Sequence, residues 1–296
     1  MNKKLLTQLG LKYNPFGLDL PLEGLLLTRL LEDFFWRVAH VLLREGGFAL
    51  VLGDPGSGKS AALRLLIDYL QRMEEVAVGV LTRPQSGIAD FYREMGELFG
   101  IDIKPHNRWA GFKNLRHLWQ EQIDTRLIRP VLLVDEAQQV QPEVLSELRV
   151  LASTRLDSHV ILSVVLAGDS RLVDLLRRPE LVPLASRIRF RLPLEPIGSE
   201  DLMEYVRHLL SQAGNAKLLT PELLQTLADH AHGNLRLLVN MANELLTAAA
   251  RQGLSQLDEK LFLSVFSPVP PSRPIGGARA LTPPPMAMPR AVASRK

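Results

Sequence analysis

Short, continuously apolar runs alternate with longer stretches of helical periodicity over the first two thirds of the chain. The apolar runs are FALVLG (48–53), VAVGVLT (76–82), PVLLVDE (130–136) and HVILSVVLAG (159–168). Runs that are apolar throughout, rather than at every second position, are typical of parallel strands covered on both faces. The stretches with helical periodicity lie between them, at about 58–73, 87–99, 110–127 and 141–154. This alternation predicts a parallel α/β sheet flanked by helices, with the alternating run 188–196 as a further edge strand.

The pattern changes on both sides of this α/β region. An irregular entry segment containing NPFG precedes a predicted helix over about 28–44, for which Thr28 is a candidate N-cap. After Pro196 helical patterns follow one another without strands, and from Ser267 the chain is rich in proline without periodicity. We therefore expect four parts, which are an N-terminal segment and helix (1–45), an α/β domain (46–196), a small all-helical domain (197–266) and a flexible basic tail (267–296).

Composition narrows the class of protein. The chain has 296 residues, of which 46% are hydrophobic, so it can bury a sizeable core. It has no cysteine, which excludes disulfides and thiolate metal sites and fits a cytoplasmic protein. The most hydrophobic stretch, 22–43, is interrupted by charged residues, so we expect a buried amphipathic helix and no membrane segment.

The net charge of +3 is unevenly distributed along the chain. Residues 268–296 carry five Lys or Arg and no acid, so residues 1–267 have a net charge of −2, the difference between +3 and +5. The positive charge therefore does not by itself indicate a nucleic-acid-binding body.

The strand at 48–53 runs into the motif G-x-x-x-x-G-K-S, which predicts a phosphate-binding P-loop. Glycines let a triphosphate approach backbone N–H groups closely, and the N-terminus of the following helix adds the positive end of its dipole. Lys59 would reach the β- and γ-phosphates of ATP, and the Ser60 hydroxyl would bind Mg²⁺. The predicted nucleotide-binding residues are Gly53, Asp54, Pro55, Gly56, Ser57, Gly58, Lys59 and Ser60.

A second motif, VLLVDEAQ (131–138), ends an apolar strand in two adjacent acids. Carboxylates at the end of a buried strand are costly unless a cation meets them. Asp135 would join the Mg²⁺ shell, and Glu136 would act as the general base that activates the attacking water. Together the two motifs predict a Mg²⁺-dependent ATPase that converts ATP to ADP and phosphate.

At this point the chain resembles an AAA+ ATPase, with residues 197–266 in the place of the family's helical lid. In LAGDSRL (166–172), Asp169 stands where the family has its sensor 1 residue. LASRIRF (184–190) resembles the arginine-finger segment, so Arg187, or alternatively Arg189, would reach the nucleotide of a neighbouring subunit. GNLRLLVNMANELL (233–246) resembles the sensor 2 helix, in which Arg236 would touch the nucleotide.

NPFG, the DEAQ form of the second motif and the GN-x-R lid together resemble the ExeA/GspA group, which includes a secretion ATPase. That group is similar to the TnsC/TniB-type ATPase regulators of DNA transposition. Secretion ExeA continues into a membrane helix and a peptidoglycan-binding domain, whereas this chain ends in a proline-rich tail. We therefore expect an ATP-dependent homo-oligomer, ring or filament, that assembles on double-stranded DNA without sequence specificity and recruits or activates a transposase. An ATPase for secretion or envelope assembly is the alternative.

Residues 104–129 contain six Lys or Arg and two acids, with three aromatic residues between them. The cations are candidate phosphate contacts on DNA, but the same segment also fits an amphipathic helix with its apolar side chains on the sheet. The resemblance to transposition ATPases adds a cation after the second strand. The candidate DNA contacts are Arg83, Lys104, Arg108, Lys113 and Arg116.

Overall fold

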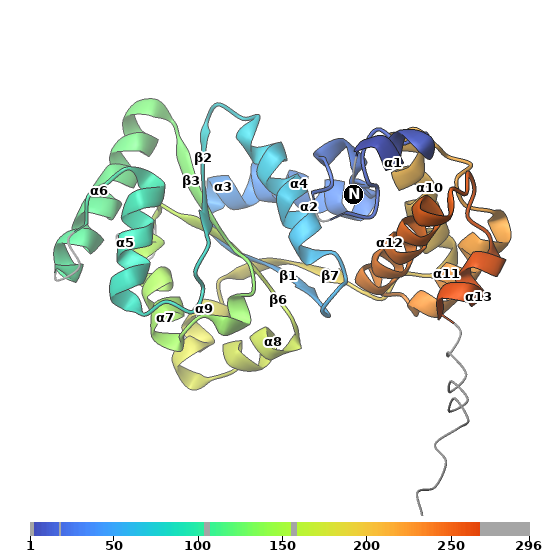
Figure 1. Cartoon of the computed structure of the whole chain (residues 1–296). Helices are drawn as coiled ribbons and strands as arrows, with labels where there is room; N and C mark the ends of the chain where they lie inside the picture. The colour runs from blue at the N-terminus through green and yellow to red at the C-terminus, as the bar shows by residue number, and fades with distance from the viewer. Residues whose placement is uncertain (1–2, 18, 104–106, 155–158, 267–296) are drawn as a thin grey trace, which may run out of the picture.

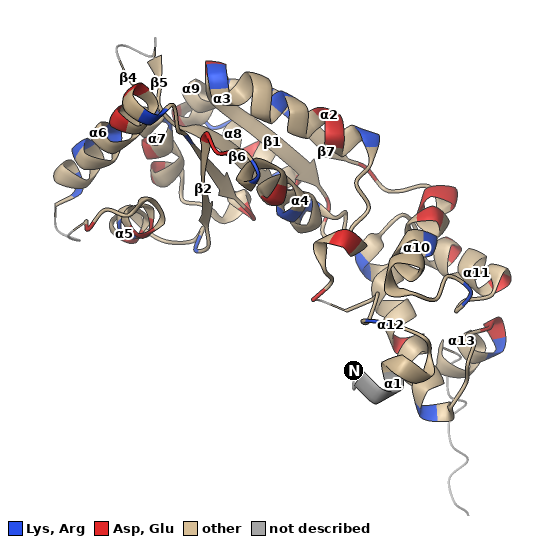
Figure 2. Ribbon diagram, turned by 90° about the horizontal axis from the view of Figure 1, so that it is seen from above, with Lys and Arg blue, Asp and Glu red and all other residues tan. Residues whose placement is uncertain are grey.

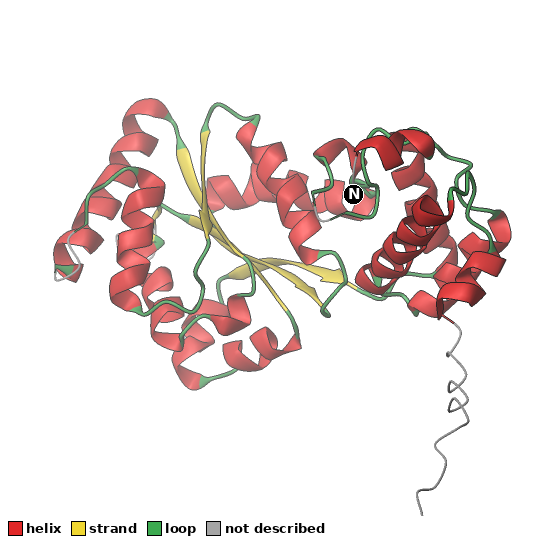
Figure 3. Cartoon of the chain, in the orientation of Figure 1, coloured by secondary structure: helices red, strands yellow, loops and turns green. Residues whose placement is uncertain are grey.

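A five-stranded parallel sheet forms the centre of the larger part of the molecule (Figures 1 and 3). The computed structural model describes residues 3–17, 19–103, 107–154 and 159–266. The strands are β1 (Gly47–Gly53), β2 (Val76–Leu81), β3 (Arg129–Val134), β6 (Ser163–Gly168) and β7 (Ile188–Leu194). Their order is β2-β3-β6-β1-β7, and all neighbouring pairs are parallel. The predicted parallel α/β sheet is confirmed, and β7 lies at an edge of it.

The sheet order brings the carboxyl ends of β1, β3 and β6 to the same edge. In the register, Leu52 of β1 pairs with Gly168 of β6, and Val134 of β3 pairs with Leu166 of β6. The residues that follow these three strands therefore meet at one place, although they come from distant parts of the chain.

One predicted strand is shorter than the sequence suggested. The run 159–168 divides into β5 (His159–Val160), which pairs antiparallel with β4 (Ser153–Thr154), and β6, which begins at Ser163. Between them, the N–H groups of Ile161 and Leu162 both donate to the carbonyl oxygen of Ala152, at 2.8 and 3.3 Å. The predicted start at 159 was therefore wrong, because these two N–H groups bond to the carbonyl oxygen at the end of α7 and not to a neighbouring strand of the sheet.

Alternate residues of the strands face two helical layers. Phe48 and Leu50 of β1 pack with α5 (Ile88–Phe99), α6 (Arg108–Arg126), α7 (Pro142–Leu151), α8 (Ser170–Leu176) and α9 (Val182–Ala185). Ala49 and Val51 face the other layer, which is formed by α2 (Arg29–Arg37), the π-helical turn η2 (Val38–Leu42), α3 (Leu43–Glu45) and α4 (Lys59–Gln71). Short 3₁₀ turns, η3 (Ala137–Gln139) and η4 (Pro179–Leu181), follow β3 and α8. The predicted helix over about 28–44 is present, and the Thr28 hydroxyl accepts from the Leu31 N–H at 3.4 Å.

The smaller part is helical and forms the lid. It consists of α10 (Ser199–Ala213), α11 (Pro221–Ala231), α12 (Leu235–Gln252) and α13 (Glu259–Phe266). The segment before α2, with α1 (Lys3–Gln8) and η1 (Leu22–Gly24), packs into the same hydrophobic cluster through Leu9, Phe16 and Leu20 (Figure 1). The Asn14 amide also donates to the Asn243 amide oxygen at 2.8 Å. The predicted N-terminal unit is therefore divided, since its first part covers the lid and its helix covers the sheet.

No helix among the described residues is long and apolar enough to cross a bilayer. The predicted tail, 267–296, and Lys104 lie outside the residues that the structure describes.

Candidate functional site

Two glycines with positive φ shape the loop between β1 and α4. The φ angles are +91° at Gly56 and +97° at Gly58, values that other residues rarely adopt. A Cβ on Gly53 would lie 2.3 Å from the Ser57 hydroxyl oxygen, so a side chain would not fit there either. The glycines noted in the sequence are therefore required by the path of the loop itself.

Lys59, the first residue of α4, is almost completely buried, with 6% of its surface exposed. Its ammonium donates to the carbonyl oxygens of Gly53 at 2.9 Å and Asp54 at 3.1 Å. These two bonds use two of the three donors of a lysine ammonium, and the remaining positive charge favours an anion beside it. The N-terminus of the 13-residue helix α4 lies at the same point and adds its dipole, so the loop fits a polyphosphate.

Ser60 and Asp135 meet beside this loop although they are 75 residues apart, with the Ser60 hydroxyl donating to Asp135 Oδ2 at 2.7 Å. The other carboxylate oxygen of Asp135 accepts from the Glu136 N–H at 2.8 Å. One hydroxyl and one carboxylate are a ligand set that Mg²⁺ completes with water and substrate phosphates. In the described part of the chain, no three His, Asp or Glu side chains gather to hold a metal by themselves. The residues therefore fit a Mg²⁺ ion that is shared with a bound nucleotide.

Glu136 directly follows Asp135 and has a left-handed backbone, with φ of 50° and ψ of 40°. Its Oε2 atom accepts from the amides of Gln138 at 2.6 Å and Gln139 at 3.5 Å. The sequence analysis missed both glutamines. Their adjacency to the paired acids in DEAQQ was the available signal, but their orientation follows from the turn η3.

Asp169 follows β6 and has 5% of its surface exposed. It caps α8 by accepting from the Arg171 N–H at 2.9 Å, and its carboxylate binds the Arg171 guanidinium at 2.6 to 3.1 Å. The hydrogen bonds from Arg171 hold the pKa of Asp169 below its usual value, against the opposing effect of burial. Arg171 also interacts electrostatically with Glu136, so it is a cation of this site that the sequence analysis did not identify.

The lid touches the P-loop through the start of α12. Asn234 caps this helix by accepting from Leu237 N–H, and its amide nitrogen donates to the Pro55 carbonyl oxygen at 3.0 Å. The Arg236 N–H donates to the Gly56 carbonyl oxygen at 3.3 Å, while the residue is exposed. The predicted lid residue Arg236 thus lies at the P-loop, and Asn234 is a second lid contact that only the structure revealed.

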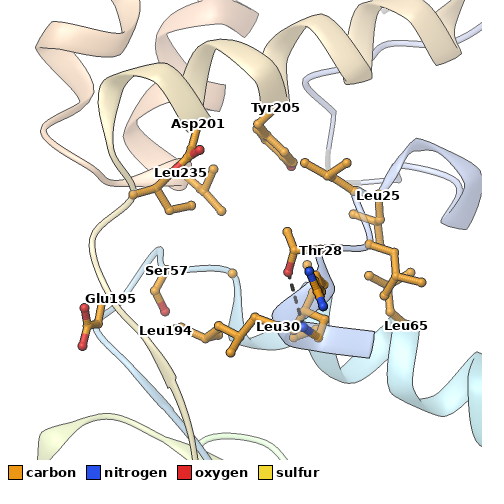
Figure 4. Close-up of a pocket in the computed structure, with 18 of the residues that line it drawn as sticks. Leu25, Thr28, Leu30, Ser57, Leu65, Leu194, Glu195, Asp201, Tyr205 and Leu235 are labelled. Atoms are coloured by element: carbon orange, nitrogen blue, oxygen red, sulfur yellow. Dashed lines mark hydrogen bonds between the residues drawn. The ribbon is translucent and has the colours of Figure 1, made fainter. Parts of the chain in front are cut away.

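A cavity of about 760 Å³ lies between the P-loop, the lid and the segment before α2 (Figure 4). Its walls include Ser57 of the P-loop, Leu235 and Tyr205 from the lid, and Leu25. Burial raises the pKa of the Tyr205 phenol above its usual value. A largely apolar cavity of this size suits the base and sugar of a nucleotide whose phosphates lie on the loop.

Arg187 lies at the opposite end of the sheet from the P-loop. Its carbonyl oxygen accepts from the Phe48 N–H at 3.1 Å, at the start of β1. β1 has seven residues, so about 20 Å of strand separates Arg187 from the P-loop of the same chain. Arg187 lines a cavity of about 310 Å³ together with Arg149 and Arg189, and Arg189 forms an ion pair with Glu45 at 2.7 Å. Any contact of Arg187 with a nucleotide would therefore be with one bound to another subunit.

The candidate DNA contacts lie mainly on α6, where cationic positions follow one another along the helix (Figure 2). Arg108 forms an ion pair with Glu147, which compensates its charge. Lys113 lies over the exposed ring of Trp109 at 4.9 Å, and Arg116 lies over Phe112 at 4.8 Å. The two rings stack on each other at 5.6 Å.

Trp109 and Lys113 of this helix are exposed, Phe112 and Arg116 are half-buried, and Leu115 and Trp119 are buried, as expected for an amphipathic helix. Arg83 is exposed and lies two residues after the end of β2, so it is at the end of the sheet where the carboxyl termini of the strands and the P-loop lie.

The fold and the geometry of the loop define a class of protein. Residues 43–176 match the family model described as an AAA domain, in a P-loop NTPase fold with a helical region after the sheet. Among solved structures, the chain resembles the ORC2 protein of Aeropyrum pernix in its ADP form, with a TM-score of 0.69 and 16% identity over 86% of this chain and 72% of that one. It also resembles Cdc6p from Pyrobaculum aerophilum, with a TM-score of 0.64 and 17% identity over 86% of this chain and 72% of that one. At these identities the likeness concerns the fold alone.

The sequence is similar to a particular protein as well. Over 248 residues it is 33% identical to General secretion pathway protein A of Aeromonas hydrophila. The alignment covers 82% of this chain and 44% of that protein, so the chain spans less than half the length of this relative. The chain therefore contains an AAA domain over residues 43–176 and is similar in sequence to General secretion pathway protein A.

Proposed function

We propose that the chain binds ATP with Mg²⁺ and hydrolyses it at the loop between β1 and α4. The contact between Ser60 and Asp135, beside the buried ammonium of Lys59, carries this proposal, because it joins the two motifs in one site. Lys59 would bind the β- and γ-phosphates, and Ser60 and Asp135 would hold Mg²⁺, which neutralises charge on the transferred phosphoryl group. Glu136 would take the proton from the attacking water.

The residues around this centre have supporting roles in the proposal. Asp169, fixed by Arg171, would help to orient the attacking water, and Arg236 would contact the nucleotide from the lid. Arg187 would reach the γ-phosphate of a nucleotide on a second copy of the chain, since its own P-loop lies at the other end of the sheet. Turnover would then require an ATP-dependent homo-oligomer, either a ring or a filament.

Two variants test this part of the proposal. Lys59→Ala removes the charge that meets the phosphates, so binding of labelled ATP should be lost. Glu136→Gln should bind ATP with nearly unchanged affinity but release phosphate at least about 100-fold more slowly, because an amide cannot act as the base. Phosphate release that is equal in the wild type and in Lys59→Ala would refute hydrolysis at this site.

For the biological role we favour a secretion or envelope-assembly ATPase, because the similarity to General secretion pathway protein A extends over 248 residues. The second candidate is a transposition-type regulator that assembles on double-stranded DNA and recruits or activates a transposase. The exposed side chains of Trp109 and Lys113, beside the half-buried Phe112 and Arg116, support this candidate, since aromatic and cationic groups favour nucleic acid.

One assay distinguishes the two roles. Fluorescence anisotropy of a labelled duplex is measured across a salt series, with either a non-hydrolysable ATP analogue or ADP. A DNA-bound oligomer predicts sequence-independent binding only with the ATP analogue, and a log–log salt slope that falls by about one unit per contact removed in Lys113→Ala or Arg83→Ala. Equal weak binding in both nucleotide states would refute the DNA role and leave the secretion-type role.

A further inference from the structure

Gln138 contacts the carboxylate proposed as the general base. It lies in the turn η3, just after β3, and its amide nitrogen donates to Glu136 Oε2 at 2.6 Å. Gln139 donates to the same oxygen at 3.5 Å. Among the described residues, no hydrogen bond reaches the other carboxylate oxygen, Glu136 Oε1. Both amides therefore hold the same oxygen of Glu136.

The orientation of the Gln138 amide is determined by this contact. If the amide were turned over, its oxygen would lie 2.6 Å from the Glu136 oxygen, and two acceptors would face each other. The nitrogen must therefore point to Glu136, and the amide oxygen must point away from it.

This orientation leaves the amide oxygen of Gln138 buried without a partner among the described residues. It packs against Gly168 at the end of β6, where a Cβ would lie 2.6 Å from it. A buried acceptor without a donor is destabilising, and such groups often mark functional positions. Gln138 thus gives up a hydrogen bond on one side to keep the bond to Glu136 on the other.

Glu136 itself carries a second unfavourable feature, its left-handed backbone at φ 50°. Residues other than glycine, asparagine and aspartate rarely adopt this conformation. Two features that lower stability therefore converge on the position of one carboxylate, which is typical of a functional site.

We infer that Gln138 is a positioning residue, which holds Glu136 by one carboxylate oxygen and leaves the other oxygen to accept the proton of the attacking water. The inference rests on the proposed ATPase activity. It assigns Gln138 no contact with ATP, so its removal should lower kcat and leave ATP affinity intact.

Gln138→Met tests the inference, because it keeps the length of the side chain but removes both polar atoms. We expect kcat to fall by about tenfold or more, since a loosely held base loses its orientation. The Kd for ATP should be unchanged, and the melting temperature should be equal to or higher than that of the wild type, because the buried unpaired oxygen is gone. A residue with a purely structural role would lower the melting temperature and kcat together.

Three further measurements complete the test. Gln120→Met removes another partly buried glutamine, outside the site, and should leave kcat unchanged. In a Glu136→Ala background, Gln138→Met should cause no further loss of activity, because the group that it orients is absent. Lys59→Ala gives the background phosphate release.

If wild-type turnover exceeds the Lys59→Ala background but Gln138→Met has the wild-type kcat, the positioning role is wrong and the proposed ATPase stands. A kcat that falls together with a lower melting temperature or a weaker Kd would also overturn the inference. Wild-type turnover equal to the background would overturn both.

Discussion

Replacing Gly56 by alanine should move the lid away from the P-loop and weaken the binding of ATP. A Cβ at this position would lie 2.3 Å from the Asn234 amide oxygen and 2.9 Å from Arg236 Cβ, so the start of α12 must move away. Two hydrogen bonds join the lid to the loop here, from Asn234 to Pro55 and from Arg236 to Gly56. Each bond contributes about 1 kcal/mol, so their loss weakens the contact between the lid and the P-loop by about 2 kcal/mol. If ATP binds between these two parts, this corresponds to a roughly 30-fold increase in the Kd for ATP.

The substitution also forces alanine into a positive φ of +91°, which costs about 1–2 kcal/mol of stability by itself. Gly100→Ala is the matched control, because Gly100 has a φ of +75° and nothing lies within 4 Å of its Cβ position. Gly100→Ala should lose only the stability that the strained backbone costs, and only Gly56→Ala should show weakened ATP binding by calorimetry. The same Kd in both variants would refute the conclusion that contact with the lid contributes to nucleotide binding.

Three further substitutions test separate features of the structure. Arg187→Ala should bind ATP but hydrolyse it poorly, and mixing it with Lys59→Ala subunits should restore phosphate release; no recovery at any mixing ratio would contradict action between subunits. Asp169 has a lowered pKa in the folded state, so its stabilising contribution is present above the unfolded pKa and is lost as pH falls through the folded one. Unfolding titrations below about pH 5 should therefore show a smaller loss of stability on acidification for Asp169→Asn than for the wild type. Phe16→Ala should destabilise the protein by about 3 kcal/mol or more, because this ring is 3% exposed in the cluster shared with the lid; an unchanged melting temperature would show that the N-terminal segment does not stabilise the lid.

Features that depend on neighbouring residues could be predicted from the sequence alone. The apolar run 48–53, the glycines that follow it and the helical pattern after Lys59 are contiguous, so strand, loop and helix could be recognised together. The N-cap at Thr28 was predicted for the same reason, because a cap bonds to a backbone group three residues away. Motif spacing also identified Asp135 and Glu136 as the acids that belong with this loop.

Only the tertiary structure decided which distant side chains meet. The contact of Asn234 with Pro55 joins residues 179 positions apart, and the Asn14 to Asn243 hydrogen bond joins residues 229 positions apart. The burial of the N-terminal segment on the lid and the pairing of Arg108 with Glu147 likewise leave no local pattern. Such contacts depend on strand register, on crossover connections and on which helical faces are complementary. A periodicity of two or 3.6 residues reports that a face is apolar, but it does not report what that face packs against.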